Sequence, residues 1–102
     1  MHYFFIVENQ SGGATIKFKE HYSGTYKEYI KNAFNELGAV YKCWEREGYG
    51  FEYCEWYTLG DQSFTYLLVN AKWCIDGNIE VISKIENALI ASKLFQKVPF
   101  ES

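Results

Sequence analysis

The residue types most often used in catalysis and metal binding are few in this sequence and widely spaced. The histidines are His2 and His21, and the cysteines are Cys43, Cys54 and Cys74. No two cysteines form a Cys-x-x-Cys pair, and no spacing between histidine and cysteine matches a common zinc or nucleophile pattern. We therefore expect reduced, mostly buried thiols, with no disulfide framework and no metal site.

Two other patterns, a possible catalytic pair of carboxylates and a possible phosphate-binding loop, lack the geometry or the residues that these sites require. Glu52 and Glu55 are an odd number of residues apart, so on one strand they point to opposite faces and cannot flank a substrate bond. Ser11-Gly12-Gly13 lacks the Lys-Ser/Thr sequence and the helix start of a phosphate-binding loop. The sequence therefore predicts a protein that is not an enzyme and that needs no cofactor.

The negative charge of the chain is concentrated in one segment. The 102 residues have a formal charge of −3, and residues 43–62 alone carry −4, with Arg46 against five acids. The acids of this segment are Glu45, Glu47, Glu52, Glu55 and Asp61. Most nucleic-acid affinity comes from neutralising phosphates. A chain without a basic excess is therefore not expected to bind nucleic acid.

The order of the strand patterns is the first guide to the fold class. Residues 2–8 are an apolar run rich in β-forming residues, and in the next strand Ile16 and Phe18 alternate with Lys17 and Lys19. This alternation predicts a hairpin with one buried and one exposed face. Three further strands are predicted at residues 39–45, 51–59 and 63–73.

Two amphipathic helices complete the pattern. The first is predicted at about residues 25–37, where Thr25 and Glu28 match the capping box and Gly38 suits the left-handed position after the last turn. The second follows Asp76-Gly77-Asn78, which offers helix caps, and carries an apolar stripe with helical spacing from Val81 to Phe95. The helices supply the apolar faces that a sheet of this kind needs.

These elements predict a single α+β domain over residues 1–102. We expect an antiparallel sheet of about five strands in the order ββ-α-βββ-α, with both helices packed on one face. No apolar run reaches the roughly 18 residues of a membrane span, and residues 3–7 lack the length and basic flank of a secretory signal. We expect a cytoplasmic protein with no membrane contact, and a loosely held tail at residues 97–102.

Residues 47–54 resemble the ribonucleoprotein motif of the RRM family of RNA-binding domains. That motif places an aromatic residue between two small residues and follows them with further aromatic and aliphatic positions. Residues 48–51 match it, and the resemblance implies base stacking on their two aromatic rings. Glu47 stands where the family has a cation, and Glu52 stands where it has an aliphatic residue. The charges, and the two strands before the first helix, argue against RNA binding.

Residues 44–61 combine aromatic and acidic residues at a density typical of a binding surface. Aromatic residues are enriched at interface hot spots, and acids steer and orient a basic partner. A basic protein such as a nuclease toxin would be attracted to such a surface and blocked by carboxylates placed where phosphates normally bind. The predicted partner-binding residues are Glu45, Glu47, Tyr49, Glu52, Tyr53, Glu55, Trp56, Tyr57 and Asp61.

Small, acidic, single-domain proteins without chemistry of their own resemble the bacterial immunity proteins, which neutralise a cognate toxin. The resemblance is one of size, charge and architecture, and it implies a toxin inhibitor or antitoxin. The alternative is a small-ligand-binding or homodimeric α+β module, which predicts a bound ligand or a dimer without any partner. We expect a monomer or a weak homodimer.

Strand alternation leaves the orientation of the strand at residues 51–59 open. One face of this strand carries Tyr53, Glu55 and Tyr57, and the other carries Cys54 and Trp56. Because Cys54 suits a core, we expect Cys54 and Trp56 to be buried and the other three residues to be exposed.

Overall fold

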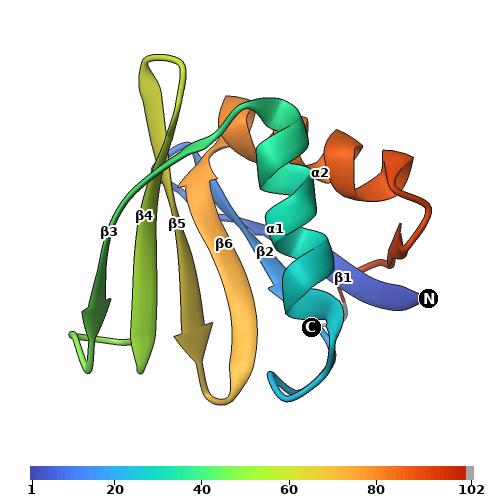
Figure 1. The fold of residues 1–102 in the computed structure, drawn as a ribbon, viewed down its shortest axis with the longest axis horizontal. Helices are drawn as coiled ribbons and strands as arrows, with labels where there is room; N and C mark the ends of the chain where they lie inside the picture. Colours follow the sequence, from blue (N-terminus) through green and yellow to red (C-terminus); the bar gives the residue numbers. More distant parts are fainter. Residues whose placement is uncertain (101–102) are drawn as a thin grey trace.

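The computed structural model describes residues 1–100 of the chain as a seven-stranded sheet with two helices (Figure 1). In chain order the elements are β1 (His2–Glu8), β2 (Gly13–Phe18), α1 (Tyr26–Leu37), β3 (Val40–Arg46), β4 (Tyr53–Leu59), β5 (Gln62–Val69), β6 (Lys72–Asn78), α2 (Ile79–Ala91) and β7 (Phe95–Lys97).

The sheet is mixed rather than purely antiparallel. Its strand order is β3-β4-β5-β6-β2-β1-β7, and β7 runs parallel to β1 while the other neighbours are antiparallel. The predicted α+β class is therefore confirmed, whereas the predicted count of about five strands and the antiparallel arrangement are wrong. The predicted first hairpin is confirmed, since Ile16 and Phe18 are buried and Lys17 and Lys19 are exposed.

The segment predicted as one strand at residues 63–73 is two strands, β5 and β6, joined by a turn. Asn70 and Ala71 both have a positive φ, of 51° and 63°. Two consecutive positive φ values are typical of the type I′ hairpin turn, which favours Asn-Gly. Because Ala71 stands where this turn usually has glycine, the turn could not be predicted from the sequence. The strand β6 then continues through Asp76-Gly77-Asn78, where a break was predicted.

Replacing Ala71 by glycine should stabilise the protein by about 0.5–1 kcal/mol. The reason is that the left-handed conformation brings the Cβ atom of alanine into steric conflict with the backbone, whereas glycine has no Cβ atom. The backbone bonds of this residue, including Tyr22 N to Ala71 O at 2.8 Å, do not depend on its side chain. Urea unfolding measures the change. Asn70→Gly is the control and should gain less, because asparagine tolerates the left-handed region. A destabilised Ala71→Gly variant would contradict the turn assignment.

The C-terminal segment contributes the seventh strand. β7 pairs with β1 from His2↔Phe95 to Phe4↔Lys97, and Phe95 is buried. Phe100 stacks on Phe5 with ring centroids 5.4 Å apart. The predicted loose tail is therefore wrong up to residue 100, and the rest of it, residues 101–102, lies outside the described residues.

The boundaries of α1 agree closely with the predicted ones, whereas α2 ends at Ala91 and the predicted extension of its stripe to Phe95 is wrong, because Phe95 lies in β7. Gly38 ends α1 in the left-handed conformation at φ 81°, and the Asn78 side chain caps α2 by accepting from the Val81 N–H at 2.9 Å. Thr25 is the N-cap of α1, but its side chain makes no cap hydrogen bond, so the capping-box contact is wrong. Both helices contribute their apolar stripes to the core.

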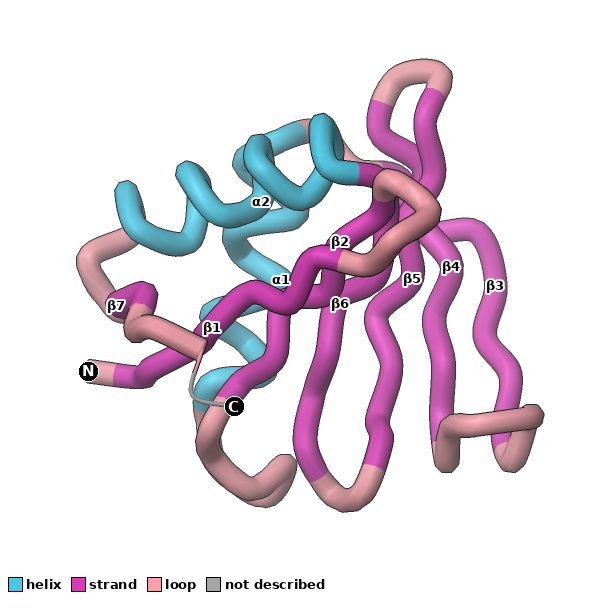
Figure 2. Tube along the Cα trace, turned by 180° about the vertical axis from the view of Figure 1, so that it is seen from behind, coloured by secondary structure: helices cyan, strands magenta, loops and turns pink. Residues whose placement is uncertain are grey.

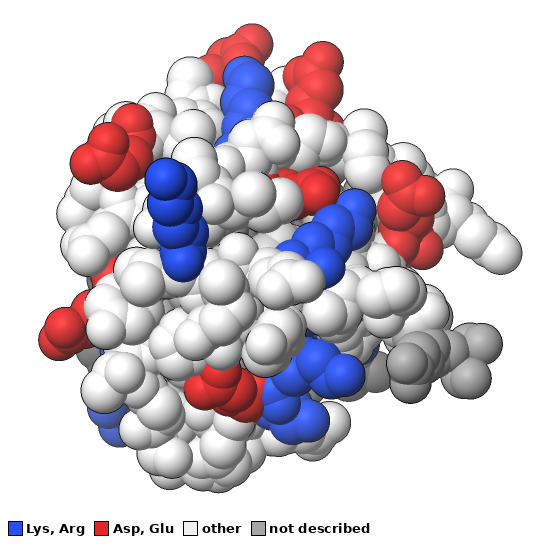
Figure 3. All heavy atoms as spheres, turned by 90° about the vertical axis from the view of Figure 1, so that its right-hand side faces the viewer, with Lys and Arg blue, Asp and Glu red and all other residues white. Residues whose placement is uncertain are grey.

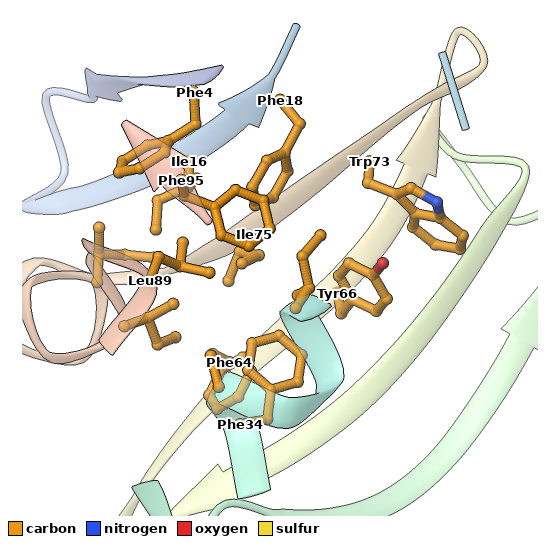
Figure 4. Packing of buried hydrophobic residues seen from close by; sticks show 14 of the residues in the cluster. Phe4, Ile16, Phe18, Phe34, Phe64, Tyr66, Trp73, Ile75, Leu89 and Phe95 are labelled. Carbon is orange, nitrogen blue, oxygen red and sulfur yellow. The ribbon is translucent and has the colours of Figure 1, made fainter. Parts of the chain in front are cut away.

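The core lies between the helices and one face of the sheet. Its largest buried side chains are aromatic, and Figure 4 shows Phe34 of α1 against Phe64, with Tyr66 beside Trp73. The rings of Tyr66 and Trp73 stack with centroids 4.4 Å apart. Alternate residues of the strands face this core, and the residues between them form the opposite face.

The opposite face of the sheet carries no helix (Figure 2). On the side of the molecule with α2 and the N-terminus, positive and negative side chains are interspersed (Figure 3). Neither helix formed by residues 1–100 is long and apolar enough to cross a membrane.

Candidate functional site

The strand β3 forms one edge of the sheet and pairs only with β4. All seven of its residues are exposed. Tyr41 and Trp44 are 46% and 55% exposed, respectively, although aromatic side chains usually find cover. An edge strand also presents unpaired backbone N–H and C=O groups on its open side. This edge therefore offers both apolar contact area and hydrogen-bonding groups to solvent.

A bulge interrupts the regular pairing of β3. Tyr41 pairs with Tyr57 and Cys43 pairs with Trp56, so Lys42 is the extra residue between them. Bulges and lysines on an edge strand hinder its extension by a further strand. The edge is thus exposed but is poorly shaped for adding another long, regular strand.

The glycine-rich stretch at residues 47–52 is the turn between β3 and β4. Glu47 and Gly50 have positive φ values of 52° and 84°, and the Glu47 N–H donates to the Glu52 carbonyl at 3.0 Å. A Cβ atom on Gly48 would lie 2.0 Å from the Phe51 ring, so any other residue there would force this ring to move. Tyr49 is fully exposed at the tip. We call β3 together with this turn the β3 edge.

Four of the predicted partner-binding residues lie on the β3 edge, and a fifth lies beside it on β4. These residues are Glu45, Glu47, Tyr49, Glu52 and Trp56, and all of them are exposed. Trp56 projects from β4 beside Cys43 and is 41% exposed. Two exposed aromatic residues outside the predicted set, Tyr41 and Trp44, also lie on β3, but they pair with Tyr57 and Glu55 and so face the other side of the sheet from Trp56.

Asp61 does not belong to the β3 edge. It lies in the turn between β4 and β5, at the opposite end of β4 from Glu47 and Glu52 (Figure 1). Seven strand residues at roughly 3.3 Å each separate the two ends by about 23 Å. The acids that are close in the sequence therefore do not form one surface patch.

The predicted orientation of β4 is wrong. Glu55 and Tyr57 are buried at 4% and 5% exposure, Tyr53 is half-buried, and Trp56 is exposed on the opposite face. Cys54 is buried as expected, but on the face without helices. Glu55 and Tyr57 therefore support the fold and cannot touch a partner directly in this structure.

Glu55 is buried because three donors surround its carboxylate. Lys31 of α1 lies 2.5 Å from Oε1, the Tyr57 hydroxyl donates to Oε1 at 2.6 Å, and the Tyr53 hydroxyl donates to Oε2 at 2.5 Å. Burial raises the pKa of Glu55, but these hydrogen bonds and the Lys31 charge outweigh it, so the net pKa lies below its ordinary value. We call these four residues the Glu55 network.

The two tyrosines of the Glu55 network are shifted in the other direction. Burial and the hydrogen bond to Glu55 raise the pKa of both Tyr53 and Tyr57 above its ordinary value. Both hydroxyls therefore stay protonated as donors. The network fastens α1 to β4 behind the β3 edge.

A cleft of about 490 Å³ lies at the end of the sheet that holds the β3–β4 turn. It is lined by Tyr22, Lys27, Arg46, Glu47, Glu52, Tyr53, Leu68 and Trp73. Backbone bonds tie its walls together, since Tyr22 donates to Ala71 and Glu52 donates to Leu68. Of these lining residues, only Glu47, Glu52 and Tyr53 were in the predicted set.

No pattern in the sequence connects Lys27, Arg46 and Trp73 with that set, because Lys27 and Trp73 belong to other elements. Residues 1–100 contain no group of three or more His, Cys, Asp or Glu side chains that could hold a metal ion. No family model matches the chain, and comparison with curated proteins and with solved structures gave no match.

Proposed function

We propose that the protein is a non-catalytic binding module of the immunity or inhibitor type, which holds a basic protein such as a nuclease toxin on its β3 edge. The observation that supports this proposal most strongly is the exposure of every residue of β3 at the rim of an otherwise well-packed sheet. Exposed aromatic residues that the fold does not need are available as contact area.

The chemistry of the β3 edge fits a basic partner. Glu45, Glu47 and Glu52 are exposed, and none of them pairs with a lysine or arginine within residues 1–100. Their carboxylates can occupy positions where phosphate groups would bind in the cleft of a nuclease. The same edge exposes Tyr49 at the tip of the turn and Trp44 on the face of β3 that carries Tyr53, and aromatic residues of this kind are enriched at interface hot spots.

The bulge at Lys42 favours contacts through side chains over extension of the sheet by a second copy of the chain. A regular antiparallel strand pair needs continuous backbone pairing, which a bulge interrupts. We therefore expect a monomer that binds its partner mainly through the side chains of the β3 edge.

The test uses two variants with the same change in charge. Glu45→Gln, Glu47→Gln and Glu52→Gln together remove three charges from the β3 edge. The matched control removes three exposed charges elsewhere, through Glu8→Gln, Glu36→Gln and Asp61→Asn. Each tagged protein is used to capture proteins from a lysate of the source organism at low and at moderate salt.

The wild-type protein and the control should retain a stoichiometric basic protein that salt releases and that is inactive while bound. The β3-edge variant should lose it, with roughly 10-fold weaker binding or more, because interface charges steer association and fix orientation. Equal capture by both variants would contradict the role of the β3 edge, and captured RNA in place of protein would overturn the proposal. Tyr49→Ser adds a test of the aromatic anchors without affecting the core.

A further inference from the structure

The cleft at the end of the sheet has the size of a small-molecule site and an unusual set of lining groups. Its volume of about 490 Å³ lies within the range of roughly 300–1,000 Å³ that is typical of ligand sites. Two cations, two carboxylates and three aromatic rings line it. The two signs of charge are thus present in equal number around one hollow.

The cations of the cleft are not neutralised by neighbouring acids. Within residues 1–100, neither Lys27 nor Arg46 has a carboxylate within 4 Å. Aromatic faces position them instead, with Lys27 Nζ 5.1 Å from the Trp73 ring centroid and Arg46 Cζ 5.6 Å from that of Trp44. Both charges remain available to an anionic group.

Another cleft of similar volume, between β1 and α2, shows the contrast. It also holds a cation, Lys97, but this lysine already pairs with Glu86 at 3.2 Å. The cation of this cleft is therefore paired with a carboxylate, whereas Lys27 and Arg46 of the first cleft are not. The second cleft therefore serves as an internal control.

The carboxylates of the first cleft lie next to each other at the base of the β3–β4 turn. The Glu47 N–H donates to the Glu52 carbonyl at 3.0 Å, so the two residues are cross-strand neighbours. Like charges in such positions repel, and a cation placed between them lowers that cost. This part of the rim is suited to an ammonium group.

The floor of the cleft is formed by Trp73, which is 4% exposed. Its indole Nε1 is fully buried and has no acceptor within residues 1–100, so a ligand in the cleft meets the ring and not this N–H. The Tyr53 ring, 6.0 Å from Trp73 between centroids, supplies an apolar wall.

We propose that this cleft binds a free α-amino acid with an aromatic side chain, in its zwitterionic form. Lys27 and Arg46 take the carboxylate, Glu47 and Glu52 take the ammonium group, and the ligand ring packs against Tyr53. An α-amino acid carries an ammonium group and a carboxylate on one carbon. It therefore complements a cleft that holds unpaired cations and carboxylates close together. This binding needs no partner protein, and it uses Arg46, Glu47 and Glu52, which also belong to the β3 edge, so a basic partner and the ligand would compete for these residues.

Three probes distinguish binding of the zwitterion from binding of a ligand that carries only one of its two charges. L-phenylalanine carries both charges, N-acetyl-L-phenylalanine carries only the carboxylate, and L-phenylalanine amide carries only the ammonium group. Calorimetric titration should show binding of L-phenylalanine and at least 10-fold weaker binding of each blocked probe. Equal binding of either blocked probe, or no binding of L-phenylalanine at 10 mM, would overturn the proposal.

The tryptophan indole N–H signals in a proton–nitrogen NMR spectrum locate the site. The exposed residues Trp44 and Trp56 can be replaced by phenylalanine to assign their signals, which leaves the remaining signal to Trp73. L-phenylalanine should shift the Trp73 signal, because the aromatic ring and the charges of the ligand lie next to the Trp73 indole that lines the cleft. Lys27→Met should weaken binding at least 10-fold, whereas Lys97→Met in the other cleft should not. A shift confined to Trp44 or Trp56 would place the ligand elsewhere and reject the proposal.

Discussion

Replacing Phe34 by alanine should lower the free energy of unfolding by about 3–5 kcal/mol, the range typical of removing a buried phenylalanine. Phe34 is 1% exposed and lies where α1 meets the centre of the sheet. Its ring centroid is 5.0 Å from those of Tyr57 and Phe64 and 5.5 Å from that of Tyr66. The cavity would therefore remove contacts to three aromatic rings on two strands, β4 and β5, at once.

Because domains of this size are stable by only about 5–15 kcal/mol, Phe34→Ala can leave little folded protein. Phe34→Leu keeps most of the volume and should cost about 1–2 kcal/mol, which urea unfolding can measure. Tyr49→Ala is the surface control, with an expected change within about 0.5 kcal/mol because Tyr49 is fully exposed. Similar losses at Phe34 and Tyr49 would contradict the packing described for α1.

Local patterns in the sequence predicted the elements that local interactions determine. The alternation around Ile16, the helix ending at Gly38 and the cap at Asn78 all depend on residues within a few positions of each other. The turn at Asn70-Ala71 was not predicted, because alanine seldom occupies a left-handed position. The strand β7 was not predicted, because its three residues form a strand only by pairing with β1, at the other end of the chain.

The orientation of β4 could not be predicted for a similar reason. Both of its faces carry aromatic and polar residues, so alternation alone did not distinguish them. The deciding partner of Glu55 is Lys31, which is 24 residues earlier in the sequence on α1. A buried carboxylate is stable only with such partners. Glu55, which was predicted to belong to the acidic surface, is therefore buried and stabilises the packing of α1 on β4 behind the β3 edge.

Replacing Lys31 by methionine should lower the free energy of unfolding by about 2–4 kcal/mol. Removing one member of a buried ion pair typically costs about 3–5 kcal/mol, and the one-third exposure of Lys31 reduces this cost. Methionine retains an apolar chain over the Tyr57 and Tyr66 rings, which Lys31 Nζ approaches at 5.8 and 5.7 Å. Adding Glu55→Gln should recover part of the loss, because no buried charge is then left unpaired.

The Glu55 network also predicts how stability depends on pH. Because the pKa of Glu55 is lowered in the folded protein, its contribution is fully present above its ordinary value of 4.5 and is lost as the pH falls through the folded-state pKa. The difference in unfolding free energy between wild type and Glu55→Gln should therefore be largest near neutral pH and shrink below pH 4.5. Glu36→Gln, at an exposed position, is the control and should show no comparable change. A difference that stays constant, or grows as the pH falls, would mean that the three donors do not hold Glu55 ionised beneath α1.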